Sequence, residues 1–305
     1  VYRALCGLEP PPRLSREALR GRGMKRKLTG VILPALIFIA GLGVLLYPAL
    51  SDIWNRHRQD TLITDYVRTV AAMTPDDFSA ERTAAAAYNA ALSHSFGDAF
   101  TGERPAPDDE YWALLDPDGT GIMGYIEIPK LSLRLPVYHG TGEDALQNGA
   151  GHLAGTSLPV GGAGTHCVIS GHRGLPSALL FTELDRLAPG DEFYLRVLDD
   201  TLAYEVDQIL TVEPADIDAL LPVEGEDYVT LLTCTPYGVN SHRLLVRGHR
   251  VEYVPQSAQV ITAAQQVSHS LGWQGKLALS AAALLLVAAA VSAAVKKTKR
   301  SKDKN

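Results

Sequence analysis

The longest hydrophobic stretches lie near the two ends of the chain. Segments 31–50 and 277–295 contain no charged residue, and each is close to the roughly 20 residues that a helix needs to cross a bilayer. We therefore predict transmembrane helices over 28–50 and 277–295. The alternative for the first segment is a cleaved signal peptide, and the alternative for the second is a buried alanine-rich helix.

Basic residues flank both segments on the side facing the nearer chain end, at 25–27 and 296–300. Because basic flanks stay in the cytoplasm, we expect both termini there and a multi-pass protein whose middle region is extracytoplasmic. Residues 1–27 would be a cytoplasmic tail, of which 1–23 is interpreted as a mis-called start or a short disordered segment. Residues 296–305 would be a basic cytoplasmic tail.

Residues 51–120 are interpreted as a helical stalk followed by a loop. A helix is expected over 51–70. Thr74, followed by a proline and two aspartates, predicts a second helix that runs to about residue 93, because it supplies a cap, a first-turn proline and acids near the positive end of the helix dipole. The charged, glycine- and proline-containing stretch 95–118 predicts a long loop, and such loops are usually functional or disordered.

Between 121 and 255 the pattern changes to short apolar runs broken by glycine and proline. This spacing predicts a closed or nearly closed β-barrel, although the pattern alone also fits a sandwich. A short helix is expected over 178–187, a helical turn over 143–148 and a polar linker over 256–276. The predicted strands cover 123–128, 133–138, 152–154, 166–170, 192–197, 201–210, 228–233 and 243–252.

Composition narrows the function classes. The 305-residue chain has a formal net charge of −6 and is basic only near its ends, which argues against a nucleic-acid partner. Three cysteines are too few for a disulfide framework, and Cys167 sits inside an apolar run, as a core residue would. A zinc site from Cys167, Cys234, His152 and His166 lacks the paired spacing of structural zinc ligands, so no metal or cofactor is expected.

A candidate nucleophile stands at the end of one predicted strand. The run over 227–233 stops at Cys234, a turn signal follows at 235–238, and the next strand begins beside Arg243. Two strands joined by a short loop bring Cys234 and Arg243 together at a sheet end. A guanidinium lowers the pKa of a neighbouring thiol, and the thiolate is the reactive form. A buried core cysteine is the alternative for Cys234 taken alone.

A cysteine nucleophile also needs a base that is distant in sequence and near in space. The apolar run over 166–170 is followed by Gly171, His172, Arg173 and Gly174. The flanking glycines suit a tight loop that leaves the imidazole accessible. His172 is therefore the candidate base.

These segments, 230–234, 170–172 and Arg243, together resemble the signature of sortases. The longer stretch Thr-Cys-Thr-Pro-Tyr-Gly-Val-Asn-Ser-His-Arg-Leu-Leu-Val-Arg-Gly over 233–248 is similar to the class C, pilus-assembling branch, and so is Gly-Tyr-Ile-Glu-Ile-Pro-Lys-Leu over 124–131. The motifs occur in the family's order. The resemblance implies a mainly β fold, a closed eight-stranded barrel with short helices, and a membrane-anchored cysteine transpeptidase of a Gram-positive bacterium.

The resemblance also implies roles for the site residues. Cys234 would attack an LPXTG-type sorting signal between threonine and glycine and form a thioester. His172 would protonate the leaving amine and later deprotonate the incoming lysine amine of a pilin. Arg243 would stabilise the oxyanion or hold the substrate backbone, and Thr233 would help to position the substrate.

Class C sortases also carry a lid, in which an aspartate, usually a proline, and then an aromatic residue plug the active site. Here Asp98 and Phe100 stand in the long loop, with Ala99 in place of the proline. Asp98 would face Arg243 and Phe100 would cover Cys234. The alternative is an ordinary loop with one exposed aromatic side chain.

Two other functions stay open. A housekeeping sortase would attach surface proteins to a peptidoglycan amine instead of a pilin lysine. A membrane-tethered barrel without chemistry would be a binding module only. The presence of cysteine, histidine and arginine at all three motif positions argues against the binding module.

Overall fold

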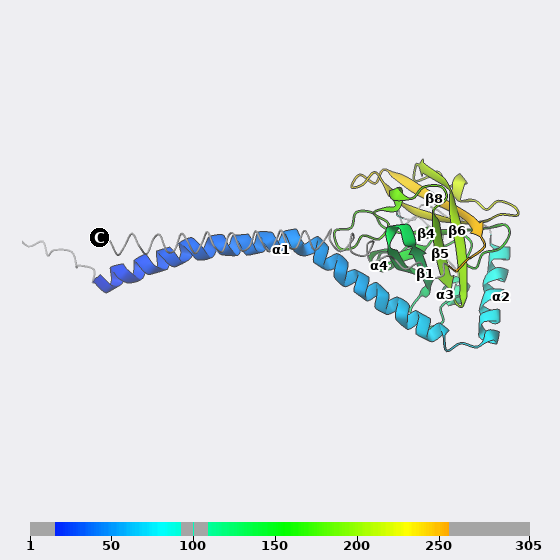
Figure 1. Cartoon of the computed structure of the whole chain (residues 1–305), viewed down its shortest axis with the longest axis horizontal. Coiled ribbons are helices and arrows are strands. Elements are labelled where there is room, and N and C mark those ends of the chain that lie inside the picture. The colour runs from blue at the N-terminus through cyan, green and yellow to red at the C-terminus, as the bar shows by residue number, and fades with distance from the viewer. Residues whose placement is uncertain (1–15, 93–99, 101–108, 256–305) are drawn as a thin grey trace, which may run out of the picture. The chain divides into compact units, whose positions relative to one another are not determined.

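The computed structural model describes residues 16–92, 100 and 109–255. Contacts divide the chain into Val1–Glu252 and Tyr253–Asn305, and every element described below lies in the first unit. Its strands form a closed barrel (Figure 1). The strand order is β1-β2-β3-β4-β7-β8-β6-β5, which confirms the expected eight-stranded architecture. The strands are β1 (Ile122–Ile128), β2 (Leu133–Tyr138), β3 (Ala150–His152), β4 (Thr165–Ser170), β5 (Glu192–Val197), β6 (Asp200–Val212), β7 (Asp227–Thr235) and β8 (His242–Val251).

The pairing of three strands creates one chemically important edge. β4 and β7 are parallel, with a register that ends at Ser170 opposite Leu232. β7 and β8 are antiparallel, and Thr235 at the end of β7 faces His242 at the start of β8. The carboxyl ends of β4 and β7 and the beginning of β8 therefore meet at the same edge of the barrel.

The barrel core explains the apolar pattern of the strands. Inside, the rings of Phe193 and Tyr204 stack with centroids 5.7 Å apart, and Gly248 lies so close that an added Cβ would come within 2.7 Å of the Phe193 ring. Outside, a second apolar cluster covers β4, β7 and β8, so these strands are buried on both faces and read as continuous hydrophobic runs. This outer cluster consists of Leu153, Val168, Leu220, Leu232 and Leu245.

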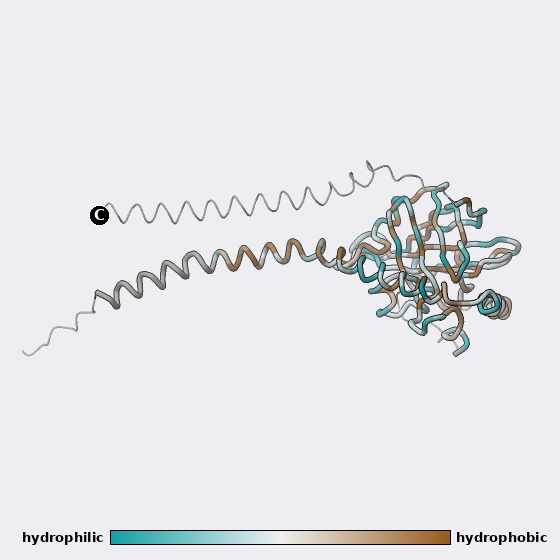
Figure 2. Tube along the Cα trace, turned by 60° about the horizontal axis from the view of Figure 1, so that its bottom comes forward, coloured by the Kyte–Doolittle hydropathy of each residue, from teal (hydrophilic) through white to brown (hydrophobic). Residues whose placement is uncertain are grey.

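The first predicted transmembrane segment and the stalk form one helix, α1 (Arg16–Val70). Within it, Pro34–Val70 contains a window that is long and apolar enough to cross a membrane, and none of that window is buried. Figure 2 shows this apolar stretch as a brown section of the helix. A signal sequence would have the same properties. The second predicted span, 277–295, lies outside the described residues.

The later part of α1 is fastened to the barrel. The Tyr66 hydroxyl donates to the Met123 carbonyl at 3.1 Å and accepts the Leu198 N–H at 2.9 Å. Earlier in the helix, the Gln59 side chain donates to the Asn148 carbonyl at 3.0 Å. These bonds join α1 to β1, to the turn that follows β5 and to the helical turn α4 (Glu143–Asn148), which the sequence predicted.

Helix α2 (Pro75–Ala91) begins where the sequence predicted. The Asp77 N–H donates to the Thr74 hydroxyl at 3.3 Å, and the Thr74 N–H donates to the Asp77 carboxylate at 2.8 Å, which makes a reciprocal capping box. Arg82 pairs with Asp199 and Asp200 at 2.7 Å each, so α2 is held beside the β5–β6 hairpin (Figure 1).

Three local predictions need correction. The helix predicted over 178–187 is wrong: only a 3₁₀ turn, η2 (Leu184–Arg186), forms there, because Leu180 has a positive φ of 38° and interrupts the helical path. The third strand lies at Ala150–His152 rather than 152–154. A short helix, α3 (Asp109–Ala113), lies within the predicted loop. The remaining 3₁₀ turns are η1 (Pro129–Leu131) and η3 (Asp218–Leu220).

Candidate active site

Cys234 and Arg243 are direct register partners across β7 and β8. Both are nearly inaccessible, with exposed fractions of 7% and 6%. One terminal nitrogen of the Arg243 guanidinium, Nη1, donates to the carbonyls of Asn240 and His242, at 3.1 Å each. Arg243 therefore both faces the cysteine and holds the chain segment that joins the two strands. The proximity of Cys234 and Arg243 is as the strand-turn-strand pattern predicted.

His172 reaches the same edge from β4. The last backbone hydrogen bond between β4 and β7 runs from the Gly171 N–H to the Leu232 carbonyl, at 3.0 Å, and His172 is the next residue. Its ring is partly buried, and among the described residues Nε2 has no hydrogen-bond partner. Burial lowers the pKa of the His172 imidazole, and the Glu143 carboxylate of α4 acts in the opposite direction.

Phe100 lies against two residues of this site. Its ring centroid lies 5.5 Å from that of His172, at an interplanar angle of 36°, and the Arg243 guanidinium carbon lies 5.2 Å from the Phe100 centroid. The side chain also packs against the outer cluster on β4, β7 and β8. Phe100 is therefore wedged between the candidate base and the candidate cation. The predicted partner residue, Asp98, lies outside the described residues.

Thr233 lies immediately before Cys234, but its side chain has an exposed fraction of 0%. Its hydroxyl donates to the Gly171 carbonyl at 2.7 Å. Gly171 itself packs tightly, since an added Cβ would lie 2.7 Å from the Phe181 ring. The Thr233 hydroxyl thus binds the loop that carries His172. The role of Thr233 in positioning the substrate stays a prediction.

Sequence reasoning assigned no role to Arg173 or Glu143. Arg173 follows His172, and its Nη1 donates to the Thr235 hydroxyl at 3.1 Å while its Nη2 donates to the Asp185 carboxylate at 2.5 Å. Its position next to the candidate base was the only available signal. Glu143 carried no signal, because only the fold brings α4 toward His172.

The other residues considered as zinc ligands lie in the protein interior, where the histidines make hydrogen bonds. Cys167 is buried, and burial raises the pKa of its thiol. His166 contacts the Thr230 hydroxyl at 2.7 Å and the Leu221 carbonyl at 3.1 Å. His152 is bound by Tyr111. Within the described part of the chain, no group of three or more histidine, cysteine or acidic side chains is arranged to hold a metal ion.

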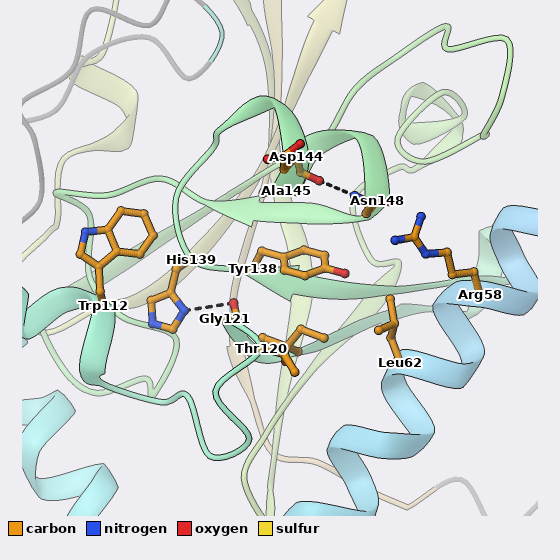
Figure 3. Close-up of a pocket in the computed structure, with 11 residues that line it drawn as sticks. Arg58, Leu62, Trp112, Thr120, Gly121, Tyr138, His139, Asp144, Ala145 and Asn148 are labelled. Carbon is orange, nitrogen blue, oxygen red and sulfur yellow. Dashed lines mark hydrogen bonds between the residues drawn. The ribbon is translucent and has the colours of Figure 1, made fainter.

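An open cleft of about 360 Å³ lies between α1, α3 and α4 (Figure 3). Tyr138 occupies its centre, with Arg58 of α1 on one side and Trp112 and His139 on the other (Figure 3). Burial raises the pKa of the Tyr138 phenol, and the Arg58 charge opposes that shift. The residues around Cys234 do not line this cleft.

Comparisons with known proteins agree with this geometry. The family model described as the sortase domain matches residues 126–251. Sortase A of Bacillus anthracis is 28% identical over 220 residues, which are 72% of this chain and 93% of that protein.

Two solved structures are more similar in sequence. Sortase C-1 of Streptococcus pneumoniae is 44% identical, with a TM-score of 0.59 over 64% of this chain and all of that one. The pilus-related sortase C of Group B Streptococcus is 40% identical, with a TM-score of 0.57 over 62% of this chain and 97% of that one. The chain therefore belongs to the sortase family of cysteine transpeptidases, in its class C branch.

Proposed function

We propose that this sortase assembles pili: it cleaves an LPXTG-type sorting signal between threonine and glycine and joins the threonine carbonyl to a lysine amine of a pilin. The observation that carries the proposal is the meeting of three strand ends at one edge. Cys234 is the register partner of Arg243, and His172 follows the parallel neighbour of the cysteine strand. The similarity to a pilus-related sortase C supports the choice of pilin as substrate.

In the first half-reaction the Cys234 sulfur bonds to the threonine carbonyl carbon, and the carbon–nitrogen bond to glycine breaks. The proton that left the thiol is delivered by His172 to the glycine amine. In the second half-reaction the lysine amine attacks the thioester. Its proton passes through His172 as the carbon–sulfur bond breaks, which regenerates the cysteine and leaves an amide.

Arg243 would stabilise the negative charge on the carbonyl oxygen in both tetrahedral intermediates, or hold the substrate backbone. A planar fork of donors suits either task. Its contacts with the carbonyls of Asn240 and His242 support this role, because they fix the guanidinium before substrate arrives.

The segment containing Asp98 and Phe100 would act as a lid. The position of the Phe100 ring against His172 and Arg243 supports this proposal, because the ring occupies space that a bound substrate needs. The lid must then open before Cys234 can react. Asp98 would hold it closed by pairing with Arg243.

The proposed location is the cell membrane, with the catalytic region 121–255 outside the cytoplasm. The apolar window of α1 supports one membrane anchor. A second span over 277–295, and cytoplasmic placement of both termini, rest on the uncharged run and the basic flanks in the sequence.

The test is mass spectrometry of the purified protein mixed with an LPXTG-type peptide. A thioester on Cys234 is expected, which Cys234→Ala abolishes and Cys167→Ala retains. Adding a pilin peptide that contains lysine should release the acyl group as an amide. Preferred transfer to a peptidoglycan stem amine would instead identify a housekeeping sortase. Failure of the protein with its lid removed to form any thioester would favour a non-catalytic barrel.

A further inference from the structure

The residues on either side of the candidate nucleophile are hydrogen-bonded to the residues on either side of the candidate base. Before the nucleophile, the Thr233 hydroxyl donates to the carbonyl of Gly171, which precedes the base, at 2.7 Å. After the base, Arg173 Nη1 donates to the hydroxyl of Thr235, which follows the nucleophile, at 3.1 Å. We call these two bonds the clasp.

The clasp begins where the backbone ladder ends. The register of β4 and β7 stops at Ser170 and Leu232, and the Gly171 N–H makes the last backbone bond between the two segments. His172 therefore lies two residues beyond the end of β4 and one residue beyond the last backbone hydrogen bond to β7. The two clasp bonds continue the connection between the segments past that point.

The clasp acts from the side of β7 opposite to the thiol. Successive side chains of a strand point to opposite faces, so Thr233 and Thr235 share one face and Cys234 occupies the other. The bonds can thus fix the spacing between base and nucleophile without occupying the position of a substrate.

Arg173 is held more firmly than a surface arginine. Its side chain has an exposed fraction of 9%, and Asp185, which binds its Nη2, is 50% exposed. Its Nε is buried and, among the described residues, has no hydrogen-bond partner. A buried donor without a partner destabilises the folded protein, so a contribution to global stability does not explain why an arginine occupies this position.

We infer that Arg173, Thr233 and Thr235 are positioning residues that hold the His172 imidazole at a fixed distance from the Cys234 sulfur. The inference rests on the proposed roles of those two residues. Proton transfer between base and reacting group depends steeply on distance, and a displacement of about 1 Å can reduce a rate by roughly 100-fold. Loss of the clasp should therefore lower kcat and leave peptide binding almost unchanged.

The test removes the bond between Arg173 and Thr235 by changing either of the two residues. Thr235→Val, Arg173→Met and the double variant are made in the full chain carrying Phe100→Ala, so that slow lid opening does not mask the chemical step. We expect each to lower kcat for peptide cleavage by roughly 10- to 100-fold, with KM within about two-fold. The double variant should be no slower than the slower single variant, because both single changes remove the same bond between Arg173 and Thr235. Thr235→Ser, which keeps the hydroxyl, should restore most of the lost kcat.

A matched control exists on the other side of the barrel, where Arg196 Nη1 donates to the Thr201 hydroxyl at 2.5 Å. Thr201→Val removes the same kind of bond, and we expect kcat to stay at the level of the Phe100→Ala parent. Melting temperatures identify any variant that fails to fold.

The inference is overturned if folded Thr235→Val and Arg173→Met keep the parental kcat, or if Thr201→Val is equally slow. The proposed function fails separately, if Cys234→Ala still cleaves the peptide.

Discussion

At the scale of single residues, Arg243 is a cation enclosed by the protein. One nitrogen of its planar fork binds the carbonyls of Asn240 and His242, and the group lies against the Phe100 ring. Lysine would keep the charge, but its donors radiate from a single atom at the end of a flexible chain. A lysine side chain at this position cannot bind both carbonyls and also donate to a further acceptor with the same geometry.

We therefore expect Arg243→Lys to lower kcat for sorting-peptide cleavage by about 100-fold or more, the usual effect of losing an oxyanion donor. Arg247→Lys is the matched control, because Arg247 lies on the same strand and makes a two-pronged contact with Asp207 at 3.0 and 2.7 Å. That variant should retain kcat. A fully active Arg243→Lys enzyme would show that charge alone matters at this position.

His152 illustrates how burial fixes the state of a titratable residue. The Tyr111 hydroxyl accepts the Gly140 N–H at 2.8 Å, which leaves its own proton for His152 Nδ1 at 2.9 Å. His152 Nε2 then donates to the Ser157 carbonyl at 2.9 Å. Burial lowers the pKa of His152 to about 4, against the opposing effect of the Ser157 hydrogen bond. The folded protein therefore holds a neutral imidazole here.

This imidazole should make the protein sensitive to acid. Below its ordinary pKa of 6.5 the unfolded chain binds a proton at His152, whereas the folded chain does not until pH about 4. The free energy of unfolding should thus fall by about 1.4 kcal/mol per pH unit over this window, or roughly 3 kcal/mol in total.

Urea denaturation between pH 4 and pH 7 measures this loss. His152→Gln should flatten the pH dependence of the unfolding free energy relative to the unmodified protein. His57→Gln, at an exposed position of α1, should leave it unchanged. An identical pH slope in His152→Gln and the unmodified protein would contradict the assignment.

At the scale of elements, the segment that carries Phe100 is the proposed lid over the barrel edge. The Phe100 ring lies against the His172 imidazole, and burial is the main cause of the lowered pKa of that imidazole. Removing the ring should hydrate the site, which favours the charged form. Because a closed lid would block Cys234, the population of the open state would set the apparent activity.

We expect Phe100→Ala, alone or with Asp98→Ala, to increase the rate of thiol labelling at Cys234 and the rate of peptide hydrolysis by about ten-fold, the effect of roughly 1.4 kcal/mol on lid opening. An NMR titration should show the pKa of His172 rising toward its ordinary value. Trp54→Ala, which removes an exposed aromatic side chain of α1, is the control and should change neither.

Ala99→Pro should slow labelling if the backbone there suits proline, because proline stiffens the closed loop. Equal labelling rates in all variants would show that this segment is not a lid.

Element boundaries also show where sequence patterns are insufficient. The alternating and continuous apolar runs predict most strands, because their side chains face a core on one or both sides. The apolar residues over 178–187 also suggest a helix, yet Phe181 must fit beneath Gly171, and its N–H bonds to the His172 carbonyl at 3.1 Å. This tertiary requirement prevails over local helix propensity.

At the scale of the whole molecule, the predicted topology places both termini on one side of the membrane. In intact protoplasts, external protease should destroy an epitope inserted at the exposed turn at Gly190 and spare an epitope appended after Asn305. Lysed protoplasts provide the control, in which both epitopes should be lost. Digestion of the C-terminal epitope from outside would show that 277–295 does not cross.

The strand pattern alone also fits a sandwich, and the family resemblance indicated the closed barrel. By itself the sequence determined most of the strands, the start of α2 and the proximity of Cys234 to Arg243. These follow from local rules: apolar runs form strands, a threonine with a nearby aspartate caps a helix, and a short loop joins neighbouring strands. It also identified His172 as a candidate, through the glycine-flanked motif and the family resemblance.

Only the tertiary structure decided which distant segments meet. The parallel pairing of β4 and β7, more than 60 residues apart in sequence, brings His172 to the edge of Cys234, and it directs Thr233 and Arg173 to the clasp. Likewise, the lid motif predicted that Phe100 would cover Cys234, but only the fold shows the contacts of its ring with His172 and Arg243. Such contacts depend on how the whole chain closes its core, since burial and long-range pairing are properties of the complete fold and not of any local pattern.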